Sequence, residues 1–129
     1  MSESVKTILF VDDEVYIRQS FADYFEDNNW NTLQAESGEK ALELLKNESP
    51  DGAVVDIRMG GMDGDVFIRR ALENKSDIGF IICTGSPEYN IPEDLLAQPS
   101  VSDSLFRKPV TDMEELEHEL LRIIDNLKP

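Results

Sequence analysis

The chain has 129 residues, a length typical of one domain, and 40% of them are hydrophobic. Its net charge of −15 comes from 27 acidic and 12 basic residues and disfavours contact with phosphate backbones, which argues against a nucleic-acid-binding protein. A single cysteine excludes an intramolecular disulfide, and no stretch resembles a signal peptide or a membrane span, so we expect a cytoplasmic protein.

Short apolar runs alternate with amphipathic segments along the whole chain. The predicted elements are, in order, strand 6–11, helix 14–27, strand 31–35, helix 38–47, strand 52–55, helix 65–73, strand 79–83, helix 92–98, strand 105–106 and helix 112–127. Several strands are apolar on both faces, which is typical of a parallel sheet covered by helices. We predict one α/β domain over residues 1–129, with a core from about 5 to 127, five βα units, a longest loop at 84–91 and no effector domain.

Polar side chains follow four of the predicted strands, at the point where each strand ends. Asp12 and Asp13 follow the first strand, Asp56 the third, Thr84 the fourth and Lys108 the fifth. Because the carboxyl ends of parallel strands meet at one edge of the sheet, where such folds bind ligands, we expect these side chains to converge.

Carboxylates gathered in this way repel one another. Two of them 4 Å apart lose about 4 kcal/mol at an effective dielectric near 20. Mg²⁺ removes the repulsion, since it prefers oxygen ligands and usually binds one or two carboxylates together with phosphate oxygens. The sequence therefore predicts a Mg²⁺ site beside a phosphoryl group.

Four motifs, VDDE, VVDIRMGGMDG, ICTG and FRKP, follow one another along the five predicted βα units. In this combination the chain resembles the receiver domain of two-component response regulators over essentially its whole length. The resemblance implies a flavodoxin-like, doubly wound fold with five parallel strands in the order 2-1-3-4-5. It also implies a phosphorelay function, in which a histidine kinase or a histidine phosphotransfer protein donates the phosphoryl group.

The resemblance assigns a role to each matching residue around the metal. Asp56 is the phosphoacceptor and also a metal ligand. Asp13 binds Mg²⁺ directly, and Asp12 contributes through the acidic pocket. The backbone carbonyl of Arg58 supplies a further ligand.

The resemblance also implies how the phosphoryl group is held. Thr84 donates a hydrogen bond to a phosphoryl oxygen, and Lys108 pairs with the phosphoryl charge. Pro109 fixes the following turn through a cis peptide bond. Without an effector domain, the output is protein–protein contact through the face formed by residues 92–98, 105–106 and 112–127, by a monomer or a phosphorylation-dependent dimer.

The chain departs from the family pattern at several positions. Gly60 stands where receivers usually have proline, and Gly85 follows Thr84, where alanine is common. Leu105 stands where the family has an aromatic residue that rotates inward on phosphorylation, so we expect a weaker or different output. Arg58, two residues after Asp56, is placed to overhang the site, and we hypothesise that it influences the lifetime of the phosphorylated state.

Two other functions stay open at this point. One is a pseudo-receiver, a binding module that is never phosphorylated, which Leu105 favours and the complete acidic pocket disfavours. The other is a Mg²⁺-dependent phosphohydrolase with an aspartate nucleophile. Enzymes of that kind, of the haloacid dehalogenase type, carry a second acid two residues after the nucleophile, whereas this chain has Arg58.

The remaining polar residues have simpler interpretations. Glu14 begins the first helix, and we expect Cys83 to be an inert core residue. We expect an exposed, solvated position for the only histidine and for the acids of the last helix, namely His118, Glu114, Glu115, Glu117 and Glu119.

Overall fold

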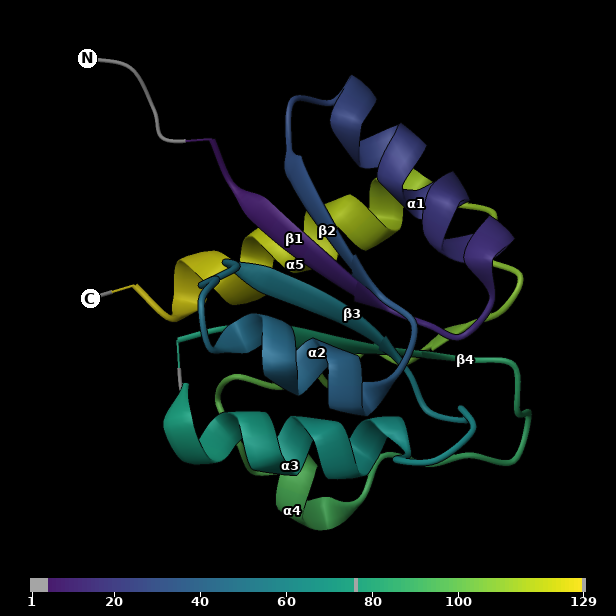
Figure 1. Ribbon diagram of the computed structural model, residues 1–129, viewed down its shortest axis with the longest axis vertical. Helices are drawn as coiled ribbons and strands as arrows, with labels where there is room; N and C mark the ends of the chain where they lie inside the picture. The colour runs from purple at the N-terminus through teal and green to yellow at the C-terminus, as the bar shows by residue number, and fades with distance from the viewer. Residues whose placement is uncertain (1–4, 76, 129) are drawn as a thin grey trace.

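The computed structural model describes residues 5–75 and 77–128, which form alternating strands and helices (Figure 1). The elements are β1 (Thr7–Val11), α1 (Val15–Asp27), β2 (Asn31–Ala35), α2 (Gly38–Leu45), β3 (Gly52–Asp56), α3 (Gly64–Asn74), β4 (Gly79–Thr84), α4 (Glu93–Leu96), β5 (Phe106–Arg107) and α5 (Met113–Asn126). Residues 1–4, 76 and 129 of the predicted domain lie outside the described residues. Within the described part of the chain, no helix is long and apolar enough to cross a membrane.

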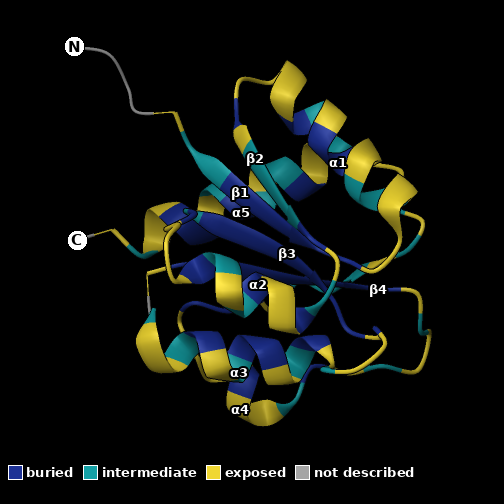
Figure 2. Ribbon diagram, viewed as in Figure 1, coloured by how far each residue is buried: buried dark blue, intermediate teal, exposed yellow. Residues whose placement is uncertain are grey.

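The strands form one parallel sheet in the order β2-β1-β3-β4-β5. The predicted doubly wound α/β fold and its strand order are therefore confirmed. Helices α1 and α5 cover one face of the sheet, while α2, α3 and α4 cover the other (Figure 1). Every residue of β3 and β4 is buried, which explains why these strands read as continuous apolar runs (Figure 2).

An aromatic cluster fills the space between the sheet and α1. Phe21 and Phe25, four residues apart on the helix, point inward together. Both rings contact Phe10 of β1 with centroids 5.3 and 5.5 Å away, and Phe25 also packs edge-on against Trp30. Cys83 lies in the same core, and burial raises the pKa of its thiol to about 12, as expected for an unreactive cysteine.

The segment between β4 and α5 differs from the prediction. Helix α4 ends at Leu96 rather than at 98, and β5 begins one residue later than expected. The reason is the sheet edge, because Phe80 pairs with Val101, and its amide donates to the carbonyl of Ser100 at 2.7 Å. The connection at 97–105 is consequently longer than the loop at 85–92 between β4 and α4.

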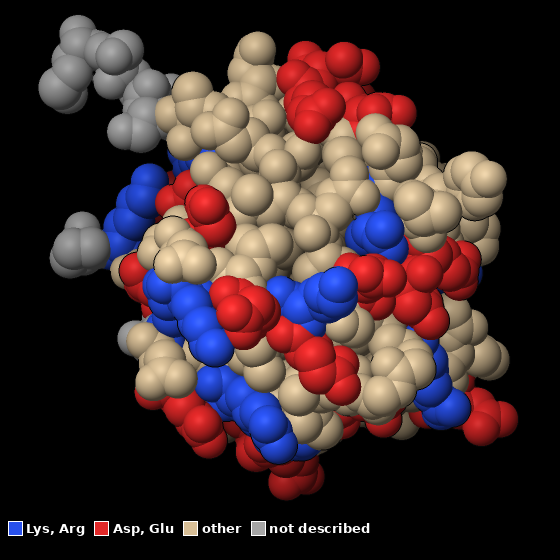
Figure 3. All heavy atoms as spheres, viewed as in Figure 1, with Lys and Arg blue, Asp and Glu red and all other residues tan. Residues whose placement is uncertain are grey.

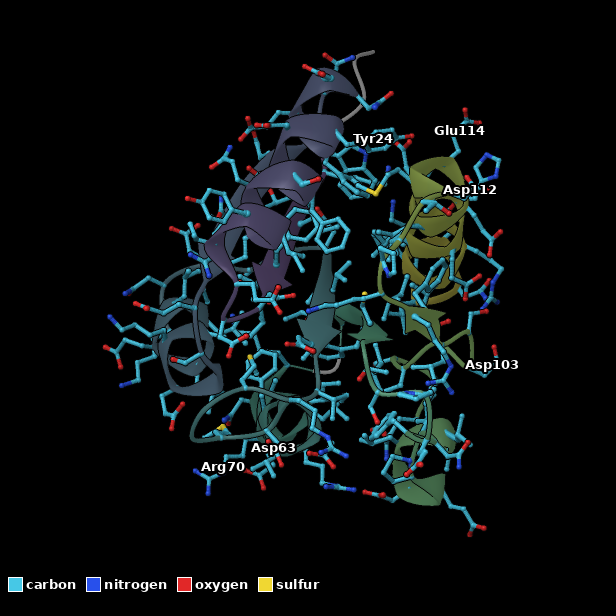
Figure 4. The ribbon with its side chains drawn as sticks, turned by 90° about the vertical axis from the view of Figure 1, so that its right-hand side faces the viewer. Tyr24, Asp63, Arg70, Asp103, Asp112 and Glu114 are labelled. Atoms are coloured by element: carbon cyan, nitrogen blue, oxygen red, sulfur yellow. The ribbon has the colours of Figure 1, made fainter. Side chains whose placement is uncertain are left out.

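Glu117 of α5 is not a solvated surface acid, contrary to the prediction. Its two carboxylate oxygens accept hydrogen bonds from Tyr24 Oη at 3.0 Å and from Trp30 Nε1 at 2.8 Å. Figure 4 shows Tyr24 lying between α1 and α5. The carboxylate therefore joins the two helices on this face of the sheet, which no pattern within α5 indicates.

Glu119 is the second exception on α5. It accepts hydrogen bonds from the hydroxyl of Ser102 and from Arg122 Nε, the latter at 2.9 Å. The carboxylate thus ties α5 to the segment before β5. The expected exposure is confirmed for Glu114, Glu115 and His118.

Gly64, the first residue of α3, lies against the end of β3. A Cβ atom at this position would stand 2.1 Å from the carbonyl oxygen of Asp56, far inside van der Waals contact. The close approach lets α3 begin directly beside the last residue of β3. Gly60, four residues earlier, has nothing within 4 Å of its Cβ position.

We predict that Gly64→Ala lowers the free energy of unfolding by about 3 kcal/mol, because the added methyl group must displace backbone. Gly60→Ala is the matched control and should stay within about 1 kcal/mol of wild type, on the stabilising side. Urea unfolding followed by circular dichroism measures both. Equal stability of the two variants would show that the approach of Gly64 to Asp56 is not required.

Candidate functional site

The strands end at one edge of the sheet, which faces the viewer in Figure 4. Asp12 and Asp13 directly follow β1, and Asp56 and Thr84 are the last residues of β3 and β4. Lys108 follows β5. The structure therefore places the five predicted side chains at the same edge.

Three carboxylates form a cluster at this edge. One oxygen each of Asp12, Asp13 and Asp56 lies within 4.8 Å of the others. Asp12 and Asp56 are only 3% and 5% exposed, whereas Asp13 is open to solvent. Buried and exposed carboxylate oxygens at this spacing suit a hard divalent cation that keeps part of its water shell. The donor set thus fits Mg²⁺.

Lys108 places one positive charge against this cluster. Its Nζ lies 2.6 Å from Asp12 Oδ2 and 3.4 Å from Asp56 Oδ2. Burial by itself lowers the pKa of the ammonium, but the hydrogen bond and the charge of Asp12, together with Asp56, outweigh burial and raise it. Lys108 therefore stays charged, yet it cannot balance three carboxylates.

The Asp56 carboxyl has a raised pKa. Burial is the largest cause of a raised pKa, and the neighbouring charge of Asp12 adds to it, while Lys108 opposes both. The net result is a pKa of about 6 instead of 3.8. A bound cation stabilises the charged form of a carboxyl group whose pKa is raised in this way.

Thr84 lies fully buried between the carboxylates and the edge strand. Its Oγ1 accepts a hydrogen bond from the amide of Ser86 at 3.1 Å, and its carbonyl accepts one from the amide of Lys108 at 2.9 Å. The peptide bond between Lys108 and Pro109 is cis, as the resemblance implies. The hydroxyl and the ammonium are thus held on adjacent chain segments.

Backbone and side-chain contacts orient Asp12. The amide of Glu14 donates to Asp12 Oδ1 at 2.9 Å, and Arg18 Nη1 donates to the carbonyl of Asp12 at 2.6 Å. The sequence did not indicate this role for Arg18. It depends on how the first turns of α1 fold back over the end of β1, which no local motif records.

An open pocket of about 370 Å³ leads to Asp56. Its lining includes Arg58, at the rim position that its spacing from Asp56 predicts, and Lys108. Glu14 also lines the pocket, so it does more than begin α1. Gly85 and Ser86 complete the lining and were not assigned to the site from the sequence, apart from the space that Gly85 leaves.

Comparisons with known proteins agree on one family. The family model described as the response regulator receiver domain matches residues 8–121. Sporulation initiation phosphotransferase F of Bacillus subtilis is 32% identical over 109 residues, which are 84% of this chain and 86% of that protein. The chain spans only 27% of a cyclic di-GMP phosphodiesterase of Thermotoga maritima and 52% of the response regulator MprA of a Mycobacterium species.

Solved structures show the same fold. A CheY-like receiver domain protein from Methanospirillum hungatei superposes with a TM-score of 0.83 at 23% identity, over 96% of this chain and 97% of that one. The response regulator TrrA of Thermotoga maritima, in complex with Mg²⁺ and beryllium fluoride, gives a TM-score of 0.78 at 24% identity, over 92% and 99%. The chain belongs to the response regulator receiver domain family, whose members are phosphorylated on an aspartate in two-component systems.

Proposed function

We propose that Asp56 is the phosphoacceptor of this receiver and that its donor is a phosphohistidine on a histidine kinase or a histidine phosphotransfer protein. The supporting observation is the gathering of Asp12, Asp13 and Asp56 beside Lys108, with Asp56 and Lys108 lining one pocket. Asp56 is the carboxylate of this group that is both buried and reached by the pocket, which suits a nucleophile.

The chemistry follows from the positions of these side chains. A carboxylate oxygen of Asp56 attacks phosphorus, the O–P bond forms, and the P–N bond breaks as the imidazole leaves with the bonding electrons. Lys108, already 3.4 Å from Asp56, pairs with the transferred negative charge, and the Thr84 hydroxyl donates to a phosphoryl oxygen. Phosphoryl transfer depends mainly on such positioning and charge neutralisation. Water attacking the same phosphorus later regenerates the carboxylate.

Asp12, Asp13 and Asp56, with the backbone carbonyl of Arg58, would hold Mg²⁺ at this site. The ion would supply the positive charge that Lys108 alone does not provide. The buried Asp12 and the exposed Asp13 would keep one side of the site anchored and the other open to water.

Receivers are signalling modules, and we propose that this one catalyses only its own phosphorylation and dephosphorylation. It would act in the cytoplasm as a single domain over residues 1–129, as a monomer or a phosphorylation-dependent dimer. Its output would be protein contact through α4, β5 and α5, without nucleic acid or a membrane.

The charge of this face indicates what kind of partner it would bind. Residues 38–49 and 64–75, which include α2 and α3, carry five cations and five acids, interleaved in Figure 3. The net charge of −15 therefore lies elsewhere. Figure 4 shows Asp103, Asp112 and Glu114 on the outer side of β5 and α5. A target that docks there would present a basic surface.

We predict that the intact protein gains one phosphoryl group when incubated with Mg²⁺ and phosphoramidate, measured by mass spectrometry. EDTA should prevent the gain, because the carboxylate cluster then repels the incoming anion. Asp56→Asn should also prevent it. Uptake of phosphate in EDTA would contradict the proposed metal dependence.

The same experiment distinguishes the alternative functions. Rapid turnover of external phosphoesters would indicate a phosphohydrolase. A folded protein that neither gains mass nor turns over phosphoesters would indicate a pseudo-receiver.

The raised pKa of Asp56 predicts how stability depends on pH. In metal-free protein Asp56 binds a proton more readily when folded than when unfolded, so its contribution to stability falls as pH rises from about 4 to about 6. Asp56→Asn removes the buried charge, and we expect it to stabilise the EDTA-treated protein by about 2 kcal/mol at pH 7.5. Urea unfolding at pH 7.5 and at pH 4 measures this gain in stability, which should nearly vanish at pH 4. A gain independent of pH would contradict the assignment.

Arg58 gives a prediction for the lifetime of the phosphorylated state. Its side chain lines the pocket through which water must approach Asp56, so Arg58→Ala should shorten the lifetime by about threefold, or about 0.6 kcal/mol. Loss of the phosphoryl mass with time measures the rate. Arg70→Ala, an exposed arginine of α3 away from this pocket, is the control. Equal rates for Arg58→Ala and wild type would exclude the role.

A further inference from the structure

The usual aromatic switch position of receivers holds Leu105 in this chain, but an aromatic side chain, Tyr89, follows Thr84 in the loop between β4 and α4. We propose that Tyr89, positioned by Arg107, couples the phosphoryl site to the surface of this protein. Both would be positioning residues that act through Thr84. The inference rests on the proposed function of Asp56, and its test separates the two.

A chain of hydrogen bonds connects Thr84 with Tyr89. The amide of Ser86 donates to Thr84 Oγ1 at 3.1 Å, and the carbonyl of Ser86 accepts a hydrogen bond from Arg107 Nη1. Arg107 Nη2 donates to the carbonyl of Tyr89 at 3.0 Å. One planar guanidinium thus holds both ends of the segment 86–89. If Thr84 Oγ1 moves toward a phosphoryl oxygen and away from the amide of Ser86, that amide loses its acceptor, and the segment must rearrange.

Tyr89 is held in a place that does not satisfy its hydroxyl group. The ring packs against the core cluster on the α3 side of the sheet, and its buried Oη has no hydrogen-bond partner among the described residues. A buried hydroxyl without a partner is destabilising, in contrast to one that is hydrogen-bonded. Burial also raises the pKa of Tyr89 to about 12. If this side chain moves toward water, its hydroxyl group gains hydrogen bonds to water. A tyrosine whose hydroxyl group was already hydrogen-bonded would gain nothing from the same movement.

A second arginine holds α4, the helix that follows this loop. Arg69 of α3 forms two hydrogen bonds with Asp94 of α4, Nε to Oδ2 at 2.8 Å and Nη2 to Oδ1 at 3.0 Å. Arg107 of β5 therefore holds the loop at 85–92 itself, and Arg69 of α3 holds the helix at its end. The loop thus has a defined resting conformation, and only a small number of contacts must break before it can adopt another one.

Leu105 is less suited to this role. It lies in an interruption of the edge strand, because β4 advances three residues from Phe80 to Cys83 while its partner advances five, from Val101 to Phe106. The hydroxyl of Ser102, within this interruption, donates to Glu119 of α5. The position that usually carries the moving aromatic is thus an aliphatic residue beside a segment fixed to a helix.

The movement of Tyr89 can be observed with fluorine NMR on the full chain labelled with 3-fluorotyrosine. The chain has three tyrosines, and Tyr16→Phe, Tyr24→Phe and Tyr89→Phe assign their resonances. With Mg²⁺ and beryllium fluoride as the phosphoryl mimic, we expect the Tyr89 resonance to shift and that of Tyr24, between α1 and α5, to stay. Thr84→Ser should retain the shift, and Thr84→Val should lose it.

The two hypotheses fail in different ways. An unmoved Tyr89 resonance in protein that gains a phosphoryl group from phosphoramidate would overturn the coupling and leave the proposed function intact. A sample that gains no phosphoryl group would overturn the proposed function and the coupling with it.

Kinetics test Arg107 separately. Because Arg107 holds the resting position, Arg107→Ala and Arg107→Lys should both speed phosphorylation by phosphoramidate, by about threefold or more. Lysine keeps the charge but not the paired donors, so a wild-type rate for Arg107→Lys would show an effect of charge alone and overturn the positioning role. Arg122→Ala, which removes an arginine bound to Glu119, is the control with an expected wild-type rate.

Discussion

The repulsion among Asp12, Asp13 and Asp56 is the constraint on which the rest of this structure depends. Two of these carboxylates are almost fully buried, and Lys108, the cation paired with them in the described part of the chain, lies closer to Asp12 than to Asp56. The site is therefore destabilising when no ligand neutralises it, and the fold must hold it by other means. Functional sites commonly carry such a cost, which the remaining core offsets.

Helices pack on both faces of the sheet and stabilise the strands that carry the acids. The acids follow or end β1 and β3, two strands that are paired on both sides and covered by helices on both faces. Each acid is also followed closely by a helix that begins at the same edge. Gly64 allows α3 to start against the carbonyl of Asp56, and Arg18 of α1 reaches back to the carbonyl of Asp12. Backbone that is fixed in this way cannot relax to separate the charges.

The sequence predicted where these side chains meet, because the signals for their positions are local. An apolar run ending in an acid identifies both the strand and the residue at its carboxyl end, and parallel pairing then brings these ends together. The hydrogen bonds of Glu117 were not predictable in the same way, since its partners Tyr24 and Trp30 lie 93 and 87 residues away. The length of α4 depended on a sheet-edge pairing of Val101 that its own sequence does not encode. Tyr89 had no pattern at all, because its importance depends on the side chains around its hydroxyl group.

The position of the acids also determines where the molecule can respond. Strands β1 and β3 lie inside the sheet, and moving either would disrupt pairing with two neighbours and both cores. Strand β5 is the short edge strand, and it pairs with β4 alone. Thr84 ends β4, the strand that pairs with this edge strand. A change that begins at Asp56 can therefore leave the core most easily through Thr84 and the loop that follows it. The loop after Thr84 and the helix α4 that follows it are held in place by a few arginine hydrogen bonds. Strands β1 and β3, in contrast, are packed against apolar side chains on both faces.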